Sequence, residues 1–204
     1  MKLYYSPGAC SLAPHIVASE AGLPLQLEKV DLKSHKLADG SDFYAVNPRG
    51  YVPAVQVKAG EPVLTEANVV VQYIADQKPE AGLMPKAGTP ERYRAQQWLA
   101  FVATELHKNF SWLWYPDTPD ATKTAVKAKL DKRFAELDAH LKGNDYLLGK
   151  NFSAADAYAF TIVNWTNFLG MNLNSFPNLK AYMDRVAARP KVQEALKAEG
   201  LVAA

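Results

Sequence analysis

The only cysteine of the chain, Cys10, lies where the turn Pro7-Gly8-Ala9 gives way to an expected helix that ends near Gly22. Unpaired N–H groups and the helix dipole favour a thiolate at a helix start, so we expect the pKa of Cys10 to fall. Without a second cysteine an internal dithiol–disulfide cycle is excluded, and thiol chemistry needs an external thiol. A small buried apolar side chain is the alternative interpretation.

Val52-Pro53 follows the turn at 47–50 and opens an expected strand. A cis proline at this place would turn the N–H and C=O groups of Val52 outward, as a free edge for an extended peptide. A trans proline at a strand start is the commoner arrangement.

Thr65-Glu66-Ala67 marks an expected junction between a strand and a helix. The N–H groups of a helix start can hold a carboxylate, and Glu66 can pair with an amine. The alternative is a plain N-cap at Thr65 with Glu66 in the first turn.

The elements that must position these residues fall into two series. The first 78 residues mix strand signals at 2–5, 25–31, 52–57 and 63–65 with helix signals at 11–22 and 67–77. Residues 79–90 hold three prolines and two glycines, and beyond them we expect helices near 90–115, 120–142, 154–170, 177–188 and 190–199. We therefore expect an α/β domain at 1–79, a linker at 80–89 and an all-helical domain at 90–204.

Composition and charge narrow the function classes. The 204 residues carry a net charge of +2, which gives no reason to expect nucleic acid or a membrane surface as a partner. Pro7, Gly8 and His15 interrupt the N-terminal stretch that a signal peptide would need, and no apolar run is long enough to span a membrane. The cytoplasm is the expected location.

The helix expected at 90–115 has two distinct faces. One is an apolar stripe of Leu99, Val102, Leu106, Phe110 and Leu113. The other is small-sided and ends in an imidazole, with Ala100, Ala103, Thr104 and His107 at helical spacing. From the residues alone, close helix packing over the alanines, with His107 as a satisfied core group, is favoured over a binding role.

Two further features of the helical half carry weaker signals. Ser153-Ala154-Ala155-Asp156 has the form of a capping box, to which we assign a role in folding. A group of aromatic side chains has two interpretations. They line an apolar pocket for an electrophile near the interdomain cleft, or they belong to the core, as aromatic residues at helical spacing more often do. These are Trp112, Trp114, Tyr115, Trp165 and Phe168.

Taken in order, these segments resemble the beta class of bacterial glutathione transferases over essentially the whole chain. The runs that carry the resemblance are Tyr4-Tyr5-Ser6-Pro7-Gly8-Ala9-Cys10-Ser11-Leu12, Asn47-Pro48-Arg49-Gly50-Tyr51-Val52-Pro53-Ala54, Leu64-Thr65-Glu66 and Thr104-Glu105-Leu106-His107-Lys108. The resemblance implies an α/β thioredoxin-like N-terminal domain followed by an all-α C-terminal domain, in a homodimer. It implies glutathione as co-substrate and no prosthetic group or metal.

The resemblance also assigns roles to individual residues. Cys10 is the partner of the glutathione sulfur, and His107 approaches that sulfur from the helical domain. Val52, before a family cis-proline that matches Pro53, pairs its backbone with the cysteinyl part of glutathione. The remaining implied contacts are Glu66 and the N–H of Ala67 at the γ-glutamyl end, Glu105 toward the neighbouring subunit's glutathione, and Tyr5, Ser11 and Thr104 near the site.

The sequence departs from the family pattern at three places. Ala67 stands where the family often has serine or glycine, so a hydroxyl contact to glutathione is missing although the N–H remains. Ala100 replaces a common asparagine near the sulfur. The lysine that grips the glycyl carboxylate falls at His35 by ungapped alignment, or at the adjacent Lys36.

The function these features imply is conjugation of glutathione to small apolar electrophiles, with thiol–disulfide exchange at Cys10 as a second mode. One alternative is a non-catalytic binding module of the same fold, which the retained Cys10, Val52-Pro53, Glu66 and His107 disfavour. Another is a specialised glutathione-dependent dehalogenase or ether-cleaving enzyme.

Overall fold

The computed structural model describes residues 1–203, which form two compact units. The first comprises Met1–Met84 together with the chain from Ala188 onward, and the second comprises Pro85–Ala187. The boundaries at 79 and 89 stay a prediction. The C-terminal helix, which we assigned to the helical domain, is nevertheless part of the first unit.

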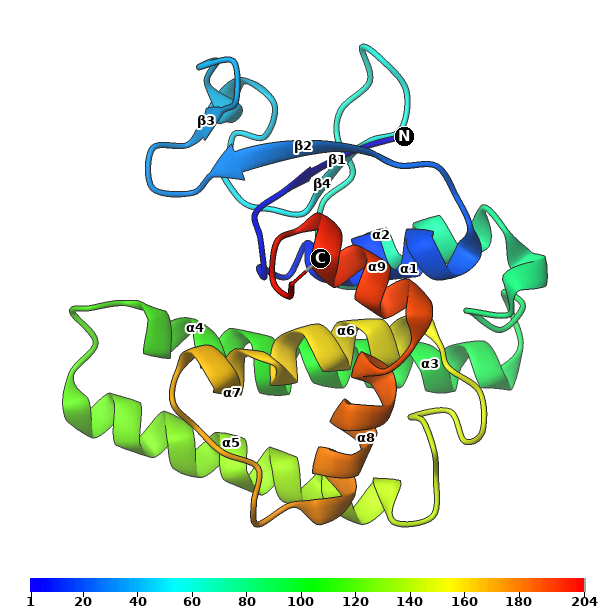
Figure 1. Ribbon diagram of the computed structural model, residues 1–204, viewed down its shortest axis with the longest axis vertical. Coiled ribbons are helices and arrows are strands. Elements are labelled where there is room, and N and C mark those ends of the chain that lie inside the picture. The colour runs from blue at the N-terminus through cyan, green and yellow to red at the C-terminus, as the bar shows by residue number, and fades with distance from the viewer. Residues whose placement is uncertain (204) are drawn as a thin grey trace. The chain divides into compact units, whose positions relative to one another are not determined.

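A four-stranded mixed sheet forms the centre of the first unit, with the strand order β3-β2-β1-β4 (Figure 1). Strand β1 (Lys2–Tyr5) pairs in parallel with β2 (Gln26–Asp31) and antiparallel with β4 (Ala54–Gln56), while β3 (Lys36–Leu37) is antiparallel to β2. In this register Leu3 lies opposite both Leu27 and Val55. Leu3 and Val55 are fully buried, which fixes the register because a one-residue shift would expose them.

The prediction of the strands needs three corrections. The third strand is shorter than 52–57, because the chain up to Pro53 is occupied by a turn and a cis peptide bond. The segment 63–65 makes only an isolated bridge from Leu64 to Val55. Strand β3 was not predicted at all, since two residues are too few to show an alternating pattern.

Two helices of the first unit begin at the positions where the candidate residues lie. Helix α1 (Leu12–Ala21) ends at Gly22, which adopts the left-handed conformation expected of a C-terminal glycine. Pro14 is tolerated because the first N–H groups of a helix have no intrahelical acceptor. Helix α2 (Ala67–Asp76) buries Val70, Val71 and Ile74, and a 3₁₀ turn (Pro79–Ala81) follows it.

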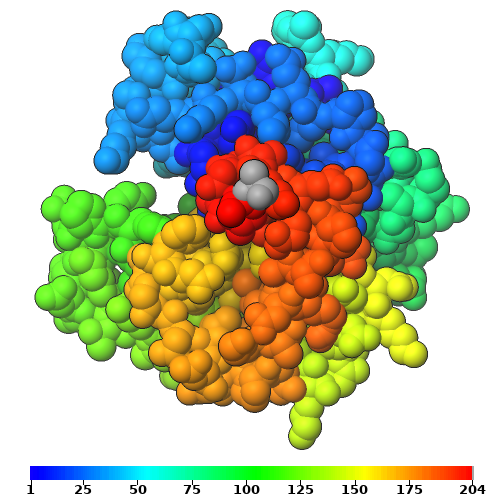
Figure 2. Space-filling view, viewed as in Figure 1, coloured from blue at the N-terminus to red at the C-terminus, as the bar shows by residue number. Residues whose placement is uncertain are grey.

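Helix α9 (Pro190–Ala198) packs on α1 within the first unit, as the red and blue surfaces in Figure 2 show. At its start, Arg189 donates two hydrogen bonds to Glu20, at 2.7 and 2.8 Å. At its end, the fully buried carboxylate of Glu199 accepts the Gly8 N–H at 2.9 Å and meets His15 Nδ1 at 2.9 Å. These contacts at both ends explain why α9 belongs to the first unit.

We predict that Glu199→Ala lowers the stability of the protein by about 2 kcal/mol or more, because Gly8 and His15 lose a buried acceptor. Chemical denaturation followed by circular dichroism measures the effect. The matched control is Glu194→Ala on the same helix, which removes an exposed pair with Lys191 and should cost less than about 0.5 kcal/mol. Equal effects of the two changes would contradict the role given to Glu199.

The second unit is all helical. Its elements are α3 (Pro90–Phe101), a π-helical segment (Val102–His107), α4 (Lys108–Trp114), α5 (Asp120–Leu141), α6 (Ala154–Val163), α7 (Trp165–Phe168) and α8 (Pro177–Ala187). The predicted apolar stripe is buried from Leu99 to Phe110, whereas Leu113 is only half-buried. The helix predicted at 154–170 is divided at Asn164 into α6 and α7. No helix within residues 1–203 is long and apolar enough to cross a membrane.

Helix α6 is the core of the second unit, because all ten of its residues are buried. The capping box predicted at its start is present, with Ser153 and Asp156 bonding each other's backbone groups. Asp156 also accepts the Leu147 N–H at 2.8 Å and the Tyr182 hydroxyl at 3.1 Å. Burial raises the pKa of Asp156 against the effect of these donors.

Asp156→Ala should destabilise the protein by about 3 kcal/mol or more, because several buried donors lose one shared acceptor. The midpoint of chemical denaturation is the measurement. Asp184→Ala, which breaks an exposed pair with Lys180, serves as the control and should leave the midpoint nearly unchanged. A similar midpoint for both variants would show that the buried network contributes little.

Candidate active site

The loop between β1 and α1 presents Cys10 at the start of the helix. Ser11 is the N-cap residue of α1, so the helix begins at Leu12, one residue later than the expected start at position 11. Ser11 is fully buried, and its hydroxyl accepts the Ser6 N–H at 3.1 Å and donates to the Ser6 carbonyl at 3.3 Å. Ser11 therefore braces the loop that carries Cys10.

The thiol of Cys10 contacts the residue before the cis proline. The Val52–Pro53 bond is cis, and Cys10 Sγ donates to the Val52 carbonyl at 3.1 Å. The side chain is buried, with 8% of its surface exposed. A thiol that donates to a carbonyl is favoured in its neutral form, and this opposes the effect of the helix start on Cys10. Two of the candidates, 42 positions apart, are thus in direct contact.

The turn before Val52 is braced by a buried asparagine. Asn47 donates its side-chain amide to the Tyr51 carbonyl at 2.7 Å, and its oxygen accepts the Arg49 N–H at 3.2 Å. Gly50 follows with a φ of 67°, and a Cβ at this place would lie 2.7 Å from the Tyr44 ring. A side chain at position 50 would therefore strain the backbone and displace its neighbours.

The two candidates for the glycyl carboxylate, His35 and Lys36, have different surroundings. The ring of His35 stacks on Tyr44 with centroids 4.6 Å apart, and its Nδ1 is buried without a hydrogen bond to any residue of 1–203. Lys36 is exposed on β3, the edge strand of the sheet. The exposed ammonium group is the better placed of the two to bind an anion from solvent.

Glu66 occupies the N-cap position of α2, so the N-cap is not Thr65. Its φ of 66° is unusual for a residue other than glycine, and such strain is often found at binding sites. The carboxylate makes no capping bond and instead accepts from Arg49 Nη1 at 3.3 Å, where both side chains are exposed. Ala67, the first residue of α2, is buried.

Tyr5 lies at the end of β1 and is half-buried. Burial raises the pKa of its phenol, and the charge of Glu199 raises it further. The phenol therefore keeps its proton at neutral pH and can donate a hydrogen bond.

In the second unit, His107 is held by two aromatic side chains. Its Nδ1 lies 2.6 Å from the Tyr158 hydroxyl, and its ring meets Trp165 edge-to-face at 5.0 Å. Burial, with a smaller effect of Lys108, lowers the pKa of His107 to about 4. The imidazole is neutral at pH 7. The unfolded chain takes up a proton near pH 6.5 and the native ring does not, so this group makes the fold less stable as pH falls toward 4.

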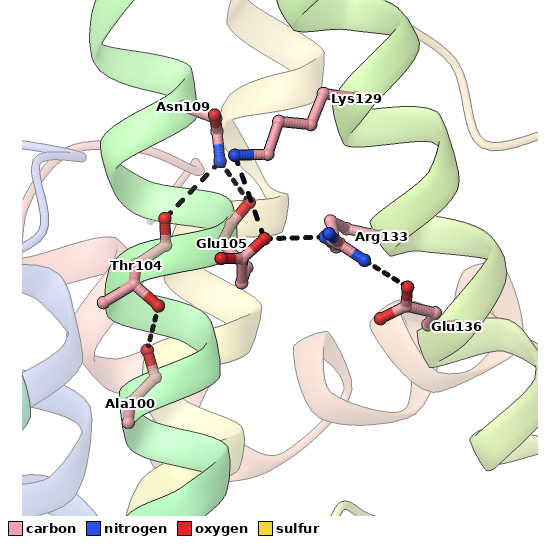
Figure 3. Close-up of polar contacts among 7 residues, drawn as sticks. All are labelled: Ala100, Thr104, Glu105, Asn109, Lys129, Arg133 and Glu136. Atoms are coloured by element: carbon pink, nitrogen blue, oxygen red, sulfur yellow. Dashed lines mark hydrogen bonds and ion pairs between the residues drawn. The ribbon is translucent and has the colours of Figure 1, made fainter.

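Three other candidates of the second unit lie on the π-helical segment or next to it (Figure 3). Ala100 and Thr104 are exposed, and the Thr104 hydroxyl donates to the Ala100 carbonyl at 3.0 Å. The carboxylate of Glu105 accepts from Arg133 Nε at 2.7 Å and lies 3.9 Å from Lys129 Nζ. Glu105 is thus paired with two cations of its own chain.

Sequence reasoning did not find the residues that hold the candidates in place. Tyr158 and Arg133 are 51 and 28 positions from their partners, and neither belongs to a motif. Asn47 lies within a turn that was recognised, but its bracing role leaves no signal in the sequence. A short stretch of sequence shows the composition of a turn but not the hydrogen bonds that its side chains make.

The expected aromatic group is only partly exposed. Trp165 is buried and packs edge-to-face on Trp114 at 5.7 Å. Its other members lie at the surface, namely Trp112, Trp114, Tyr115 and Phe168. Within residues 1–203 no cluster of His, Cys, Asp or Glu side chains is arranged to hold a metal ion.

The chain is similar to known proteins over nearly its whole length. Residues 1–76 match the family described as Glutathione S-transferase, N-terminal domain, and residues 97–190 match its C-terminal domain. Glutathione S-transferase GstA of Escherichia coli O157:H7 is 44% identical, in an alignment that covers 98% of this chain and 100% of that protein.

Two solved structures have the same fold. A bacterial beta-class glutathione S-transferase from Sphingomonas chungbukensis is 45% identical, with a TM-score of 0.94 over 99% of this chain and 100% of that one. A sphingomonad glutathione S-transferase complexed with glutathione is 44% identical, with a TM-score of 0.93 and the same coverage. The expected thioredoxin-like domain with an all-helical companion is thereby confirmed. The chain belongs to the glutathione S-transferase family, with bacterial beta-class enzymes among its near relatives.

Proposed function

We propose that this protein is a glutathione transferase that conjugates glutathione to small apolar electrophiles, with Cys10 beside the sulfur of the bound glutathione. The observation that carries the proposal is the contact between the Cys10 thiol and the backbone of Val52, at a cis Val52–Pro53 bond. The Cys10 sulfur thus lies beside the backbone of Val52, which can pair with an extended peptide. Glutathione is a peptide that contains a thiol, so it suits both groups.

The other contacts follow from what each residue exposes. Glu66 is held beside Arg49 and stays accessible, so its carboxylate binds the γ-glutamyl amine while the Ala67 N–H binds the carboxylate. Lys36 binds the glycyl carboxylate. The ring of His35 packs against Tyr44 and lies close to Gly50, so it supports the turn before Val52. Tyr5 donates to the sulfur region from the end of β1.

In conjugation, the glutathione thiol first loses its proton to solvent. Its sulfur then forms a bond to the electrophilic carbon. In a substitution, a leaving group such as halide departs with the electron pair of its bond. In an addition, the electron pair of the double bond moves onto the electrophile, which then takes a proton from solvent. Hydrogen-bond donors at the site stabilise the glutathione thiolate. The Cys10 thiol is one such donor, once it turns from the Val52 carbonyl.

In thiol exchange, Cys10 itself reacts. Its thiol gives up the bond to Val52 and its proton, and the thiolate attacks one sulfur of oxidised glutathione. A mixed disulfide forms as one glutathione thiolate leaves, and a second thiol regenerates Cys10. Both modes use one shielded sulfur site, so they compete for it.

The substrate and the assembly complete the proposal. The exposed aromatic rings of Trp112, Trp114 and Tyr115 offer an apolar surface for the electrophile. A homodimer is proposed on the family likeness. Glu105 takes part there only if it loosens its ion pairs with Arg133 and Lys129.

We predict that the protein treated with oxidised glutathione gains the mass of one glutathione in intact mass spectrometry, and that reductant removes it. Cys10→Ser should gain none, because Cys10 is the only thiol of the chain. Conjugation of chlorodinitrobenzene should fall by roughly a hundredfold in Cys10→Ala, which removes the donor at the reacting charge, whereas the hydroxyl of Cys10→Ser can still donate. An unmodified wild type with unchanged turnover in Cys10→Ala would refute the role of Cys10.

His107→Asn should lower kcat for conjugation by roughly tenfold or more, with little change in the KM for glutathione, because a neutral ring donor aids the reacting sulfur. Steady-state kinetics at pH 7 is the measurement. His140→Asn is the control, since His140 is a histidine of the same unit whose ring bonds the Leu147 carbonyl and packs on Trp98. Equal rates for wild type and His107→Asn would remove His107 from the mechanism.

A further inference from the structure

The helix that carries His107 changes its hydrogen-bond register at that residue. Helices α3 and α4 are continuous through the π-helical segment Val102–His107, and the Lys108 N–H bonds the Ala103 carbonyl, five residues back. A π turn holds one residue more than an α turn. Side chains beyond it are therefore rotated by about 100° from where a continuous α-helix would put them.

A buried side chain bonds this turn from within the helix. Asn109 has 8% of its surface exposed, and its amide donates to the Glu105 carbonyl at 2.6 Å and lies 3.5 Å from the Thr104 carbonyl (Figure 3). The first acceptor is four residues back and the second is five. They are the carbonyls that the main-chain N–H of Asn109 would bond in an α-helix and in a π-helix, respectively.

We propose that Asn109 is a positioning residue, whose side chain holds the turn in the π register and so fixes where His107 lies. The side-chain amide competes with the main-chain N–H for the Glu105 carbonyl, the acceptor that the α register needs. The 2.6 Å bond is the shorter of the two, as this competition requires.

The hydrogen-bond register of this turn is important because it determines the directions of two side chains, those of His107 and Glu105. His107 meets Tyr158 on α6 and Trp165 on α7, and two residues earlier Glu105 meets Arg133 on α5. An α register across 102–107 would move these side chains relative to their partners, which lie on separate helices. The importance of Asn109 for catalysis rests on the proposed function of His107, whereas its importance for the position of the ring does not.

The test is the titration of the His107 ring, followed by NMR in wild type, Asn109→Leu and Ser111→Ala. Leucine has the same branched shape as asparagine without its donors, so no cavity is left where the amide was. Ser111 is the matched control, because its hydroxyl bonds a carbonyl of the same helix, that of His107, at 3.3 Å without competing for the Glu105 acceptor.

Wild type and Ser111→Ala should titrate alike, with a pKa near 4, because the ring is buried against Tyr158. In Asn109→Leu the pKa of His107 should rise toward 6.5 by about one unit or more, because the ring leaves its buried position. A pKa unchanged in Asn109→Leu would overturn the proposal.

Kinetics of the same variants separates this inference from the proposed function. A lower kcat with an unchanged KM for glutathione in Asn109→Leu, together with the shifted titration, supports both. A shifted titration with unchanged kcat supports the positioning role and refutes the catalytic role of His107.

A measurement on the wild type covers the case in which Asn109→Leu does not fold. The side-chain amide protons of Asn109 should exchange with solvent at least about tenfold more slowly than those of the exposed Asn172, because they are bonded inside the helix. Equal exchange rates would show that the amide does not hold the turn and would overturn the proposal.

Discussion

The second unit depends on one constraint, which is that a helix without an exposed face must have its polar ends satisfied inside the protein. Helix α6 meets this constraint through Asp156, whose oxygens serve its own N-terminus, the loop at Leu147 and Tyr182 on α8. Once α6 is fixed, Tyr158 has a definite place, and with it the ring of His107. The position of a candidate catalytic group is thus a consequence of how a buried helix is capped.

The first unit solves a related problem with residues from the far end of the chain. The loop before Cys10 turns through Gly8, whose N–H is accepted by a carboxylate on the segment after α9. The same carboxylate meets His15 on α1, so one acceptor joins the loop to the helix that follows it. In both units a single buried carboxylate serves several donors.

Local patterns in the sequence predicted much of the fold, because helical period, prolines and glycines act over a few residues. The start of α9, the glycine after α1 and the capping box of α6 were all visible in this way. The strand β3 was too short to show a period. The π-helical segment was not predicted, because the apolar spacing from Leu99 to Phe110 suits an α-helix equally well.

The candidate site was predicted as a set of residues, but its contacts were not. Position in a turn indicated Cys10 and Val52, and nothing local shows that the thiol would donate to that carbonyl. Similarly, the choice between His35 and Lys36 depends on whether a ring stacks on Tyr44. Contacts between residues that are far apart in the chain depend on the fold, and a single sequence carries no record of them.

The packing of α9 on α1 also determines when, during synthesis, the first unit can be completed. A ribosome makes residues 1–84 first, yet the acceptor for Gly8 and His15 is residue 199 and the partner of Glu20 is residue 189. Gly8, His15 and Glu20 therefore lack these partners until the second unit and α9 have been synthesised. A nascent chain that ends before α9 leaves exposed the part of α1 on which α9 packs in the complete protein.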